Sequence, residues 1–376
     1  MHQSKLWYHS IEEGILQLLQ KLNRPETNFE FNPVLLGNTK SGNKIKLGPS
    51  IYALKILKIL NNKEFLNNNT ISEWGDFINS FQKQNSKFPT NSFIDEGYLT
   101  EITKFNLQND FKNLIKKIIL SFNEKVPFEE NEKKIVKSVK AETKQAISIL
   151  HEFNMKNKYL YIDFPRLDSS IKNYLDSYNW KYPWNSGAQF AGQCLFISTQ
   201  LPEDERLQCK KVLSSFIKNK VNKETGFYYE GSLPQSAQLV NGAMKVLTGL
   251  QWIDEEIHYP KKIIDYSLNY VPNREGCDLI DVVHVLSLCG KQSGYKKNQI
   301  IKYFDNILNM VKEHYQPKTG GFSYFINKSQ THYYGLKISD GRDTSDLHGT
   351  LLCLWAISII LDFKEDSSQN WNILKP

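Results

Sequence analysis

The sequence lacks a hydrophobic run long enough to cross a membrane. Its most apolar stretch, residues 351–361, is far shorter than the about 20 residues that a transmembrane helix needs. The beginning of the chain carries Glu12, Glu13 and two nearby histidines, which is not typical of a secretory signal peptide. We therefore expect no transmembrane segment and a cytoplasmic protein.

Cysteine is also scarce, and no nucleic-acid-binding motif is present. The five cysteines are odd in number and scattered through predicted helices, as is typical of reduced thiols. Although the net charge is +7, it comes without a recognition motif, so nucleic acid is not an expected partner. In the lysine-rich residues 112–144, interspersed Glu favours a solvated helix face; peripheral contact with an anionic membrane is the alternative.

No part of the chain has the alternating pattern of a β-rich domain, and the predicted fold class is all-α. A hydrophobic content of 40% with 23% charged residues is typical of a globular protein. Residues 154–165 are expected to be extended. Apolar residues three and four apart predict amphipathic helices at 5–22, 71–82, 107–122, 130–153, 207–221, 260–271 and 298–315. More uniformly apolar helices are expected at 50–60 and from near Asn185, Pro234, Asp278 and Leu347.

One pattern recurs along the chain: a Gly-aromatic turn, a polar loop, and then an apolar helix. It is clearest in residues 319–361 and looser in residues 223–250, and segments 46–60, 183–199 and 276–290 repeat its loop and helix. The last four apolar helices begin roughly forty to fifty residues apart, which is the size of a helical-hairpin repeat. Amphipathic helices lie between them, as expected for an inner ring of apolar helices surrounded by an outer ring.

This repeated pattern resembles the α/α-toroid superfamily, best over residues 184–361. That superfamily includes squalene-hopene-type terpene cyclases and the β-subunits of protein prenyltransferases. The resemblance implies one α/α-toroid domain over residues 1–376, in which 1–45 and 100–165 form packing helices and loops. It also implies an enzyme that binds an isoprenoid-like substrate in an aromatic-lined central cavity.

Terpene cyclases of this type carry Asp-x-Asp-Asp-Thr at the mouth of an inner helix, where the middle Asp protonates a double bond. The similar position here reads Asp346-Leu347-His348-Gly349-Thr350, so His and Gly replace the central acidic pair. This departure argues against ordinary squalene-type cyclisation. The resemblance leaves Asp343, Asp346 and His348 as candidates for proton transfer or metal binding.

Prenyltransferase β-subunits bind zinc through Asp, Cys and His. The resemblance matches His348 to the zinc His and Asp281 to the zinc Asp, but Val283 stands where the Cys is expected. Cys277, Asp281 and His284 have the i, i+4 and i+7 spacing of one helical face, so with His348 they are a possible zinc site.

Aromatic residues gather in the loops at the predicted mouth and are candidates for substrate contact, by cation–π shelter of a carbocation or by sugar stacking. They are Tyr228, Tyr229, Tyr333 and Tyr334, and Trp184 is a further candidate on an apolar helix.

Two alternatives to the isoprenoid enzyme remain. His332 and Tyr333, with Arg342 nearby, can instead form an acid–base set for an acidic polysaccharide, as in a lyase, epimerase or hydrolase. A non-catalytic binding toroid is the other alternative. A closed hydrophobic cavity would favour the isoprenoid enzyme, and an open basic groove would favour the carbohydrate enzyme. A mouth that is filled by the protein's own side chains would favour the non-catalytic binding protein.

Overall fold

The computed structural model describes residues 7–25, 27–84, 87–104 and 131–376 of the chain. Within these ranges helices predominate, so the all-α prediction is confirmed. The strands are two short antiparallel pairs, β1 (Gln82–Lys83) with β2 (Ser92–Phe93), and β3 (His332–Tyr333) with β4 (Leu336–Lys337). The helix predicted at 107–122 lies outside the described residues.

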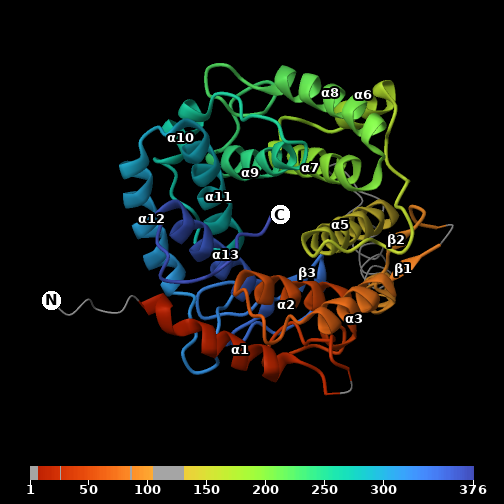
Figure 1. Cartoon of the computed structure of the whole chain (residues 1–376), viewed down its shortest axis with the longest axis vertical. Coiled ribbons are helices and arrows are strands. Elements are labelled where there is room, and N and C mark those ends of the chain that lie inside the picture. Colours follow the sequence, from red (N-terminus) through yellow and green to blue (C-terminus); the bar gives the residue numbers. More distant parts are fainter. Residues whose placement is uncertain (1–6, 26, 85–86, 105–130) are drawn as a thin grey trace, which may run out of the picture.

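Six of the described helices contact one another in a closed ring (Figure 1). Each contacts the next in sequence, and the last contacts the first. Five of the six are largely apolar; α13, for example, buries all but two of its residues. The helix over residues 131–152 is polar and amphipathic, and it lies in the ring, although residues 130–153 were expected to form a packing helix outside it. The ring consists of α2 (Leu47–Ile59), α5 (Asn131–Glu152), α7 (Pro183–Gln200), α9 (Ser236–Trp252), α11 (Gly276–Ser293) and α13 (Leu347–Phe363).

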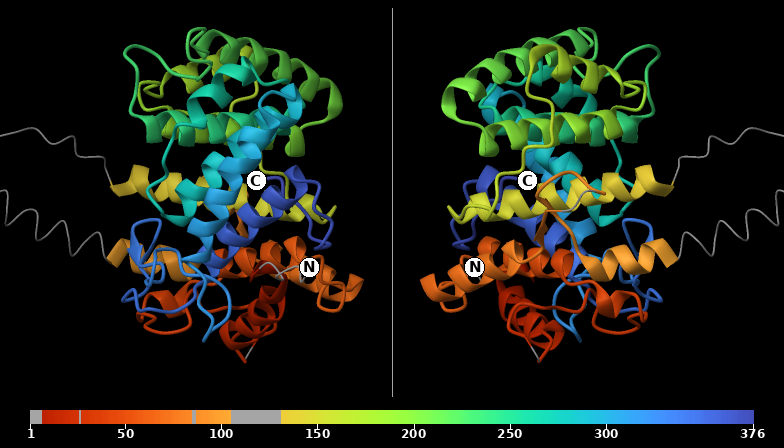
Figure 2. Two further views of the ribbon diagram at one scale, coloured as in Figure 1. Left: turned by 90° about the vertical axis from the view of Figure 1, so that its left-hand side faces the viewer. Right: turned by 90° about the vertical axis from the view of Figure 1, so that its right-hand side faces the viewer.

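The other described helices lie outside this ring. They are α1 (Ile11–Leu22), α3 (Asn68–Asn79), α6 (Asp168–Asp176), α8 (Glu203–Lys220), α10 (Pro260–Ser267) and α12 (Lys297–Lys312). In the side views of Figure 2, α1 (red) and α8 (green) lie at opposite ends of the molecule. An outer helix buries one face only: α12 buries Ile300, Phe304, Ile307, Leu308 and Val311, which are three and four residues apart.

The apolar helices predicted near Asn185, Pro234, Asp278 and Leu347 are confirmed as α7, α9, α11 and α13. Two short 3₁₀ helices, at Trp7–Ser10 and Gly42–Lys44, and helix α6 were not predicted. Residues 154–165 contain neither helix nor strand. Chain periodicity therefore located the long helices and the short α10 but missed α6, in which few apolar positions repeat.

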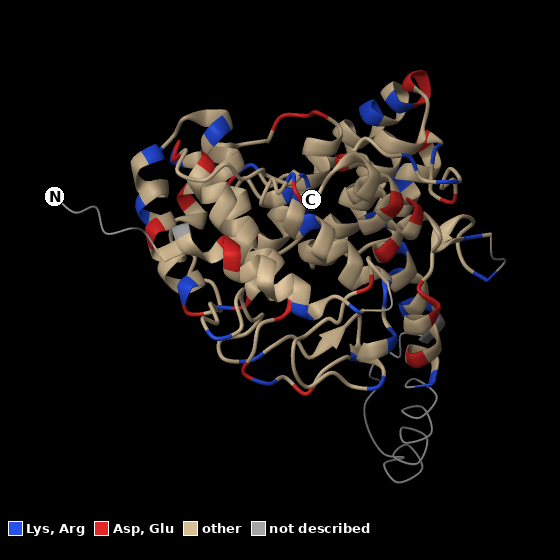
Figure 3. Ribbon diagram, turned by 60° about the horizontal axis from the view of Figure 1, so that its bottom comes forward, with Lys and Arg blue, Asp and Glu red and all other residues tan. Residues whose placement is uncertain are grey.

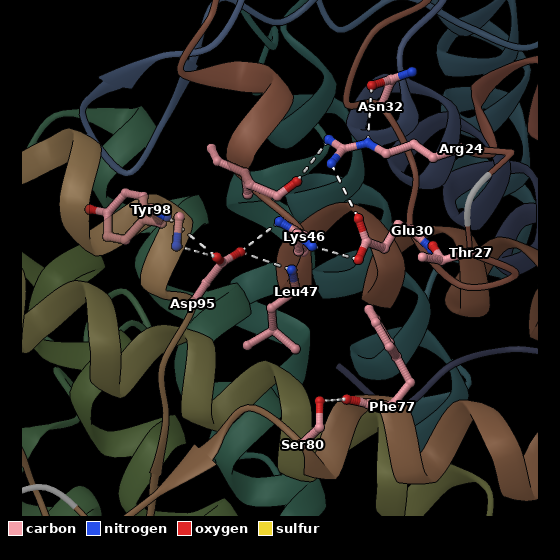
Figure 4. A network of polar contacts seen from close by, with 12 residues as sticks. Arg24, Thr27, Glu30, Asn32, Lys46, Leu47, Phe77, Ser80, Asp95 and Tyr98 are labelled. Atoms are coloured by element: carbon pink, nitrogen blue, oxygen red, sulfur yellow. Dashed lines mark hydrogen bonds and ion pairs between the residues drawn. The ribbon is translucent and has the colours of Figure 1, made fainter.

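The start of α2 depends on a residue far away in sequence (Figure 4). The Asp95 carboxylate accepts hydrogen bonds from the backbone N–H groups of Lys46 at 2.6 Å and Leu47 at 2.9 Å. Beside it, Glu30 accepts from the Lys46 ammonium at 2.7 Å and forms an ion pair with Arg24 at 3.4 Å. Asp95 thus supplies the acceptor that the free N–H groups of a helix N-terminus require.

Acidic and basic residues are spread over the outside of the molecule (Figure 3). The described part of residues 112–144 is mixed: Lys133, Lys134 and Lys137 are exposed, as expected, whereas Lys144 faces the ring interior. None of the described helices combines the length and the apolar character that crossing a membrane requires.

Candidate functional site

The ring of helices encloses a cavity of about 150 Å³, which we call the central cavity. Five of the six ring helices contribute side chains to it: α2, α5, α9, α11 and α13. One part of its wall is apolar and consists of Met244, Ile280, Leu351, Leu352 and Trp355. Larger cavities, of about 450 and 570 Å³, open on the outer surface, and none of the predicted site residues lines them.

Three lysines from three different helices line the central cavity. Lys55 of α2 donates a hydrogen bond to the side-chain oxygen of Gln145, and the Lys245 ammonium of α9 lies 3.8 Å from a carboxylate oxygen of Asp281. Lys144 of α5 has no hydrogen-bond or ion-pair partner among the described residues. Asp281 is the one side-chain carboxylate among the lining residues, so basic side chains outnumber acidic ones around the cavity.

Burial weakens the protonation of Lys55 and Lys144, and repulsion by neighbouring lysines adds to this effect at Lys144. Burial lowers the pKa of Lys55 to about 8. Burial, and then the nearby ammonium groups of Lys245 and Lys55, lower the pKa of Lys144 to about 7. Burial raises the pKa of Asp281 to about 6, although Lys245 opposes this change. A bound anion would relieve the repulsion and favour the charged lysines.

His348, at the start of α13, lies between two tyrosine rings and lines the central cavity. Its ring is stacked on Tyr52, with centroids 4.8 Å apart and planes at 9°, and on Tyr324 at 5.1 Å and 28°. Burial, followed by the charges of Lys245 and Lys55, lowers the pKa of His348 to about 3. The imidazole is therefore neutral near pH 7, and with this pKa it is a weak base whose unpaired Nδ1 is suited to a hydrogen bond rather than to holding a proton.

The two aspartates predicted to act with His348 lie elsewhere. Asp346 is the N-cap of α13 and accepts backbone hydrogen bonds from Gly349 and Tyr324, both at 2.7 Å, and from Gln330 at 3.0 Å. Burial raises its pKa to about 6, although these donors oppose the rise. Asp343 is exposed and accepts a hydrogen bond from Gln316 at 2.9 Å. Of this predicted trio, His348 alone lines the central cavity.

The four predicted zinc ligands do not converge. Cys277, Asp281 and His348 line the central cavity, whereas His284 packs near the Trp355 ring, with centroids 5.6 Å apart. Across the described ranges, no three His, Cys, Asp or Glu side chains are grouped closely enough to hold a metal. Burial also raises the pKa of Cys277 to about 11, which disfavours the thiolate that zinc requires.

The predicted aromatic mouth is not formed by the tyrosines of residues 223–250 or by Trp184. Tyr228 and Tyr229 are buried in the core, where the Tyr228 hydroxyl lies 3.3 Å from Nδ1 of His258. Trp184 is 46% exposed at the start of α7. None of the three lines the central cavity, so the prediction that they contact substrate there is not supported by their positions.

The predicted His, Tyr and Arg set of the loop before α13 is divided between solvent and interior. His332 and Arg342 are exposed. Tyr333 points inwards, and its hydroxyl donates to the Glu142 carboxylate at 3.0 Å. Tyr334 has a φ of 42°, and its carbonyl accepts from the Tyr98 hydroxyl at 2.9 Å. The hairpin of β3 and β4 is thus joined to α5 by the Tyr333–Glu142 hydrogen bond, and these residues do not share one pocket.

Our sequence analysis missed the three lysines. It assigned Lys144 to a solvated face and did not consider Lys55 or Lys245. A signal was present, because Lys245 is the one lysine in the apolar run LVNGAMKVLTGL, and Lys55 and Lys58 are the two lysines in the largely apolar run LGPSIYALKILKI. A charged residue on a buried helix is rarely accommodated without a partner or a polar cavity.

Comparisons with protein-family models, curated proteins and solved structures give no match to this chain.

Proposed function

We propose that the chain is an α/α toroid and an enzyme that binds an anionic, isoprenoid-like substrate in its central cavity. The closed ring of apolar helices, with one-sided amphipathic helices outside it, supports the toroid. The observation that carries the functional proposal is the placement of Lys55, Lys144 and Lys245 around one cavity with a single carboxylate.

Charge complementarity favours an anion. Ammonium groups removed from water lose hydration energy, and a bound anion with several oxygen acceptors replaces much of it. A diphosphate provides both the negative charge and the acceptors, and Lys144 has no other described partner. The lysines would also neutralise the charge that develops on a departing diphosphate.

The apolar wall and the size of the cavity favour a short hydrocarbon. Met244, Leu351 and Trp355 offer a dry surface for it. At about 150 Å³ the cavity is smaller than the roughly 300–1,000 Å³ typical of sites for drug-sized ligands. We therefore expect a five-carbon isoprenyl diphosphate to fit the cavity as it stands.

One further residue of the cavity is suited to proton transfer. Asp281, with a pKa of about 6, exchanges its proton near neutral pH, whereas His348, with a pKa of about 3, stays neutral and would orient the substrate through a hydrogen bond. Both line the central cavity beside the lysines. In the proposed enzyme Asp281 would remove a proton from the hydrocarbon part of the substrate or return one to it.

A carbohydrate enzyme is the alternative function, because the lysines of the central cavity would also bind the carboxylate of a uronic acid. A polysaccharide needs an open groove, however, and the central cavity is lined by five ring helices and by Leu374 and Pro376 of the segment that follows α13. The enclosed shape therefore favours the small isoprenoid diphosphate.

The test is calorimetric binding of dimethylallyl diphosphate, inorganic pyrophosphate and a galacturonate trisaccharide. We expect the two diphosphates to bind and the Kd to rise at least tenfold in Lys55→Met and Lys245→Met. Lys302→Met is the matched control, because Lys302 is exposed on the outer helix α12. Absence of diphosphate binding, or equal binding by all variants, would contradict the proposal, and selective binding of the trisaccharide would replace it with the carbohydrate function.

A further inference from the structure

The segment Trp371–Pro376, which we call the strap, enters the ring and forms part of the wall of the central cavity. Leu374 and Pro376 line the cavity, and Leu374 is 5% exposed. Figure 1 shows the C mark inside the ring. The strap has no helical or strand hydrogen bonding of its own, so its position depends on contacts with the ring and with α1, where the Trp371 indole N–H donates to Glu12 at 3.2 Å.

One end of the strap is attached to the end of α2. The Asn372 backbone N–H donates to the Ile59 carbonyl at 2.7 Å, and its side-chain amide donates to the Lys58 carbonyl at 2.8 Å. The last carbonyls of a helix have no partners within the helix, so they are free to hold such a segment.

The other end of the strap is attached to the end of α9, across the cavity. The Trp252 indole N–H donates to the Pro376 carbonyl at 2.7 Å, and the Lys375 ammonium lies 4.3 Å from the Trp252 ring centroid. The strap thus bridges the C-terminal ends of two ring helices, α2 and α9.

Tyr333 does not line the cavity, but its ring lies 6.3 Å from that of the cavity-lining Tyr52 and is packed more tightly than the strap. It is buried in a separate hydrophobic cluster with Ile45, Tyr98 and Leu336, and its hydroxyl donates to Glu142. A Cβ atom at Gly48 would lie 2.2 Å from the Tyr333 hydroxyl, so the packing leaves no space. Because local opening is easiest where few contacts hold a segment, the strap is the closure that opens first.

We infer that the strap is a removable wall of the central cavity and that Leu374 and Pro376 limit the length of the substrate. With the strap in place, the cavity holds a five-carbon chain. With the strap displaced, a longer isoprenoid chain extends between the ends of α2 and α9. The length limit rests on the proposed function, whereas the closure itself does not.

The closure is tested without any ligand. Thr248 of α9 lines the cavity, so the substitution Thr248→Cys places a reactive thiol there. The background substitution Cys277→Ser removes the native thiol of the cavity, and the other four cysteines are buried. We expect the rate of maleimide labelling to rise at least tenfold when residues 371–376 are deleted. Gln369→Ala, just before the strap, is the control and should leave the rate unchanged. An unchanged rate in a folded deletion variant would overturn the closure.

A milder variant covers the case in which the deletion does not fold. Trp252→Phe keeps an aromatic ring under Lys375 but removes the hydrogen bond to Pro376. We expect its labelling rate to lie between those of the intact and deleted strap. A rate equal to that of the intact protein would show that this bond does not hold the strap closed.

The length limit is tested by calorimetry with pyrophosphate, dimethylallyl diphosphate and farnesyl diphosphate. Deleting the strap should increase the affinity for the farnesyl compound relative to the dimethylallyl compound at least tenfold and leave pyrophosphate within about twofold. If pyrophosphate binds and the labelling rate rises but the ratio stays the same, the length limit is wrong. If neither form binds pyrophosphate, the proposed function fails, and the labelling result still decides the closure.

Discussion

Replacing Lys144 with methionine should stabilise the protein while it abolishes anion binding. Methionine keeps most of the apolar stem of lysine and removes the ammonium group. The pKa of Lys144 is lowered from 10.5 to about 7, so the folded state holds this proton less readily than the unfolded state. The cost of the charge is present in full below pH 7 and disappears as the pH rises towards 10.5, because the unfolded chain then also loses the proton.

The size of the effect follows from this pKa. A change from 10.5 to about 7 corresponds to at most roughly 4–5 kcal/mol of unfolding free energy. Because the side chain is only partly buried and the cavity admits solvent, screening reduces this to roughly 1–3 kcal/mol at pH 6. In a chain of 376 residues, that amounts to a rise in Tm of roughly 1–4 °C.

The assay is thermal unfolding at pH 6 and pH 9.5, with and without pyrophosphate. We expect the Tm of Lys144→Met to exceed that of the wild type at pH 6, with a smaller difference at pH 9.5. Pyrophosphate should raise the Tm of the wild type and leave that of the variant unchanged. Lys302→Met, on the exposed face of α12, should behave as the wild type in both respects.

A lower Tm at pH 6 in Lys144→Met would refute the reasoning, since it would mean that the ammonium has a stabilising partner. A retained response to pyrophosphate in the variant would separate Lys144 from the anion site. Stabilisation that does not depend on pH would indicate that methionine improves packing and that charge is not the cause.

Three further predictions concern the central cavity and the packing of Tyr333 against Gly48. His348→Phe should abolish turnover and leave the Tm unchanged or higher, because it keeps the stacking and removes a buried Nδ1 that has no partner; retained turnover would mean that His348 only packs. Gly48→Ala should lower the unfolding free energy by roughly 1–3 kcal/mol through its clash with Tyr333, and a Tyr333→Phe background should reduce that loss; an additive double mutant would contradict the clash. Sulfate, whose charge is constant in this range, should bind less tightly between pH 7 and pH 9 as Lys144 and Lys55 lose protons; calorimetric affinity that is constant or rises with pH would contradict this.

The long helices could be predicted from the sequence because their burial repeats along the chain. The apolar spacing of α12 and the continuous apolar run of α13 each reflect a local property, namely which faces of the helix are buried. The N-cap of α13 is also local, since Asp346 precedes the helix it caps. For α2 the cap is Asp95, and no local pattern reveals a partner so distant along the chain.

The candidate site was decided mainly by tertiary structure. His348 was found from its place at the start of an apolar helix, but its stacking between Tyr52 and Tyr324 and its lowered pKa depend on other elements. Tyr228 was predicted at the mouth and lies in the core, because aromatic side chains suit both environments.

What the sequence determined by itself is the helical class, the position of the long helices and the apolar character of five of the six that form the ring; the place of α5 in the ring was not predicted. Which side chains of the ring face the central cavity was decided only when the helices closed upon one another. Both the core and the cavity wall lie away from bulk water, so periodicity does not distinguish them. Lys55, Lys144 and Lys245 come from three separate helices, and it is the closure of the ring that brings them around one cavity.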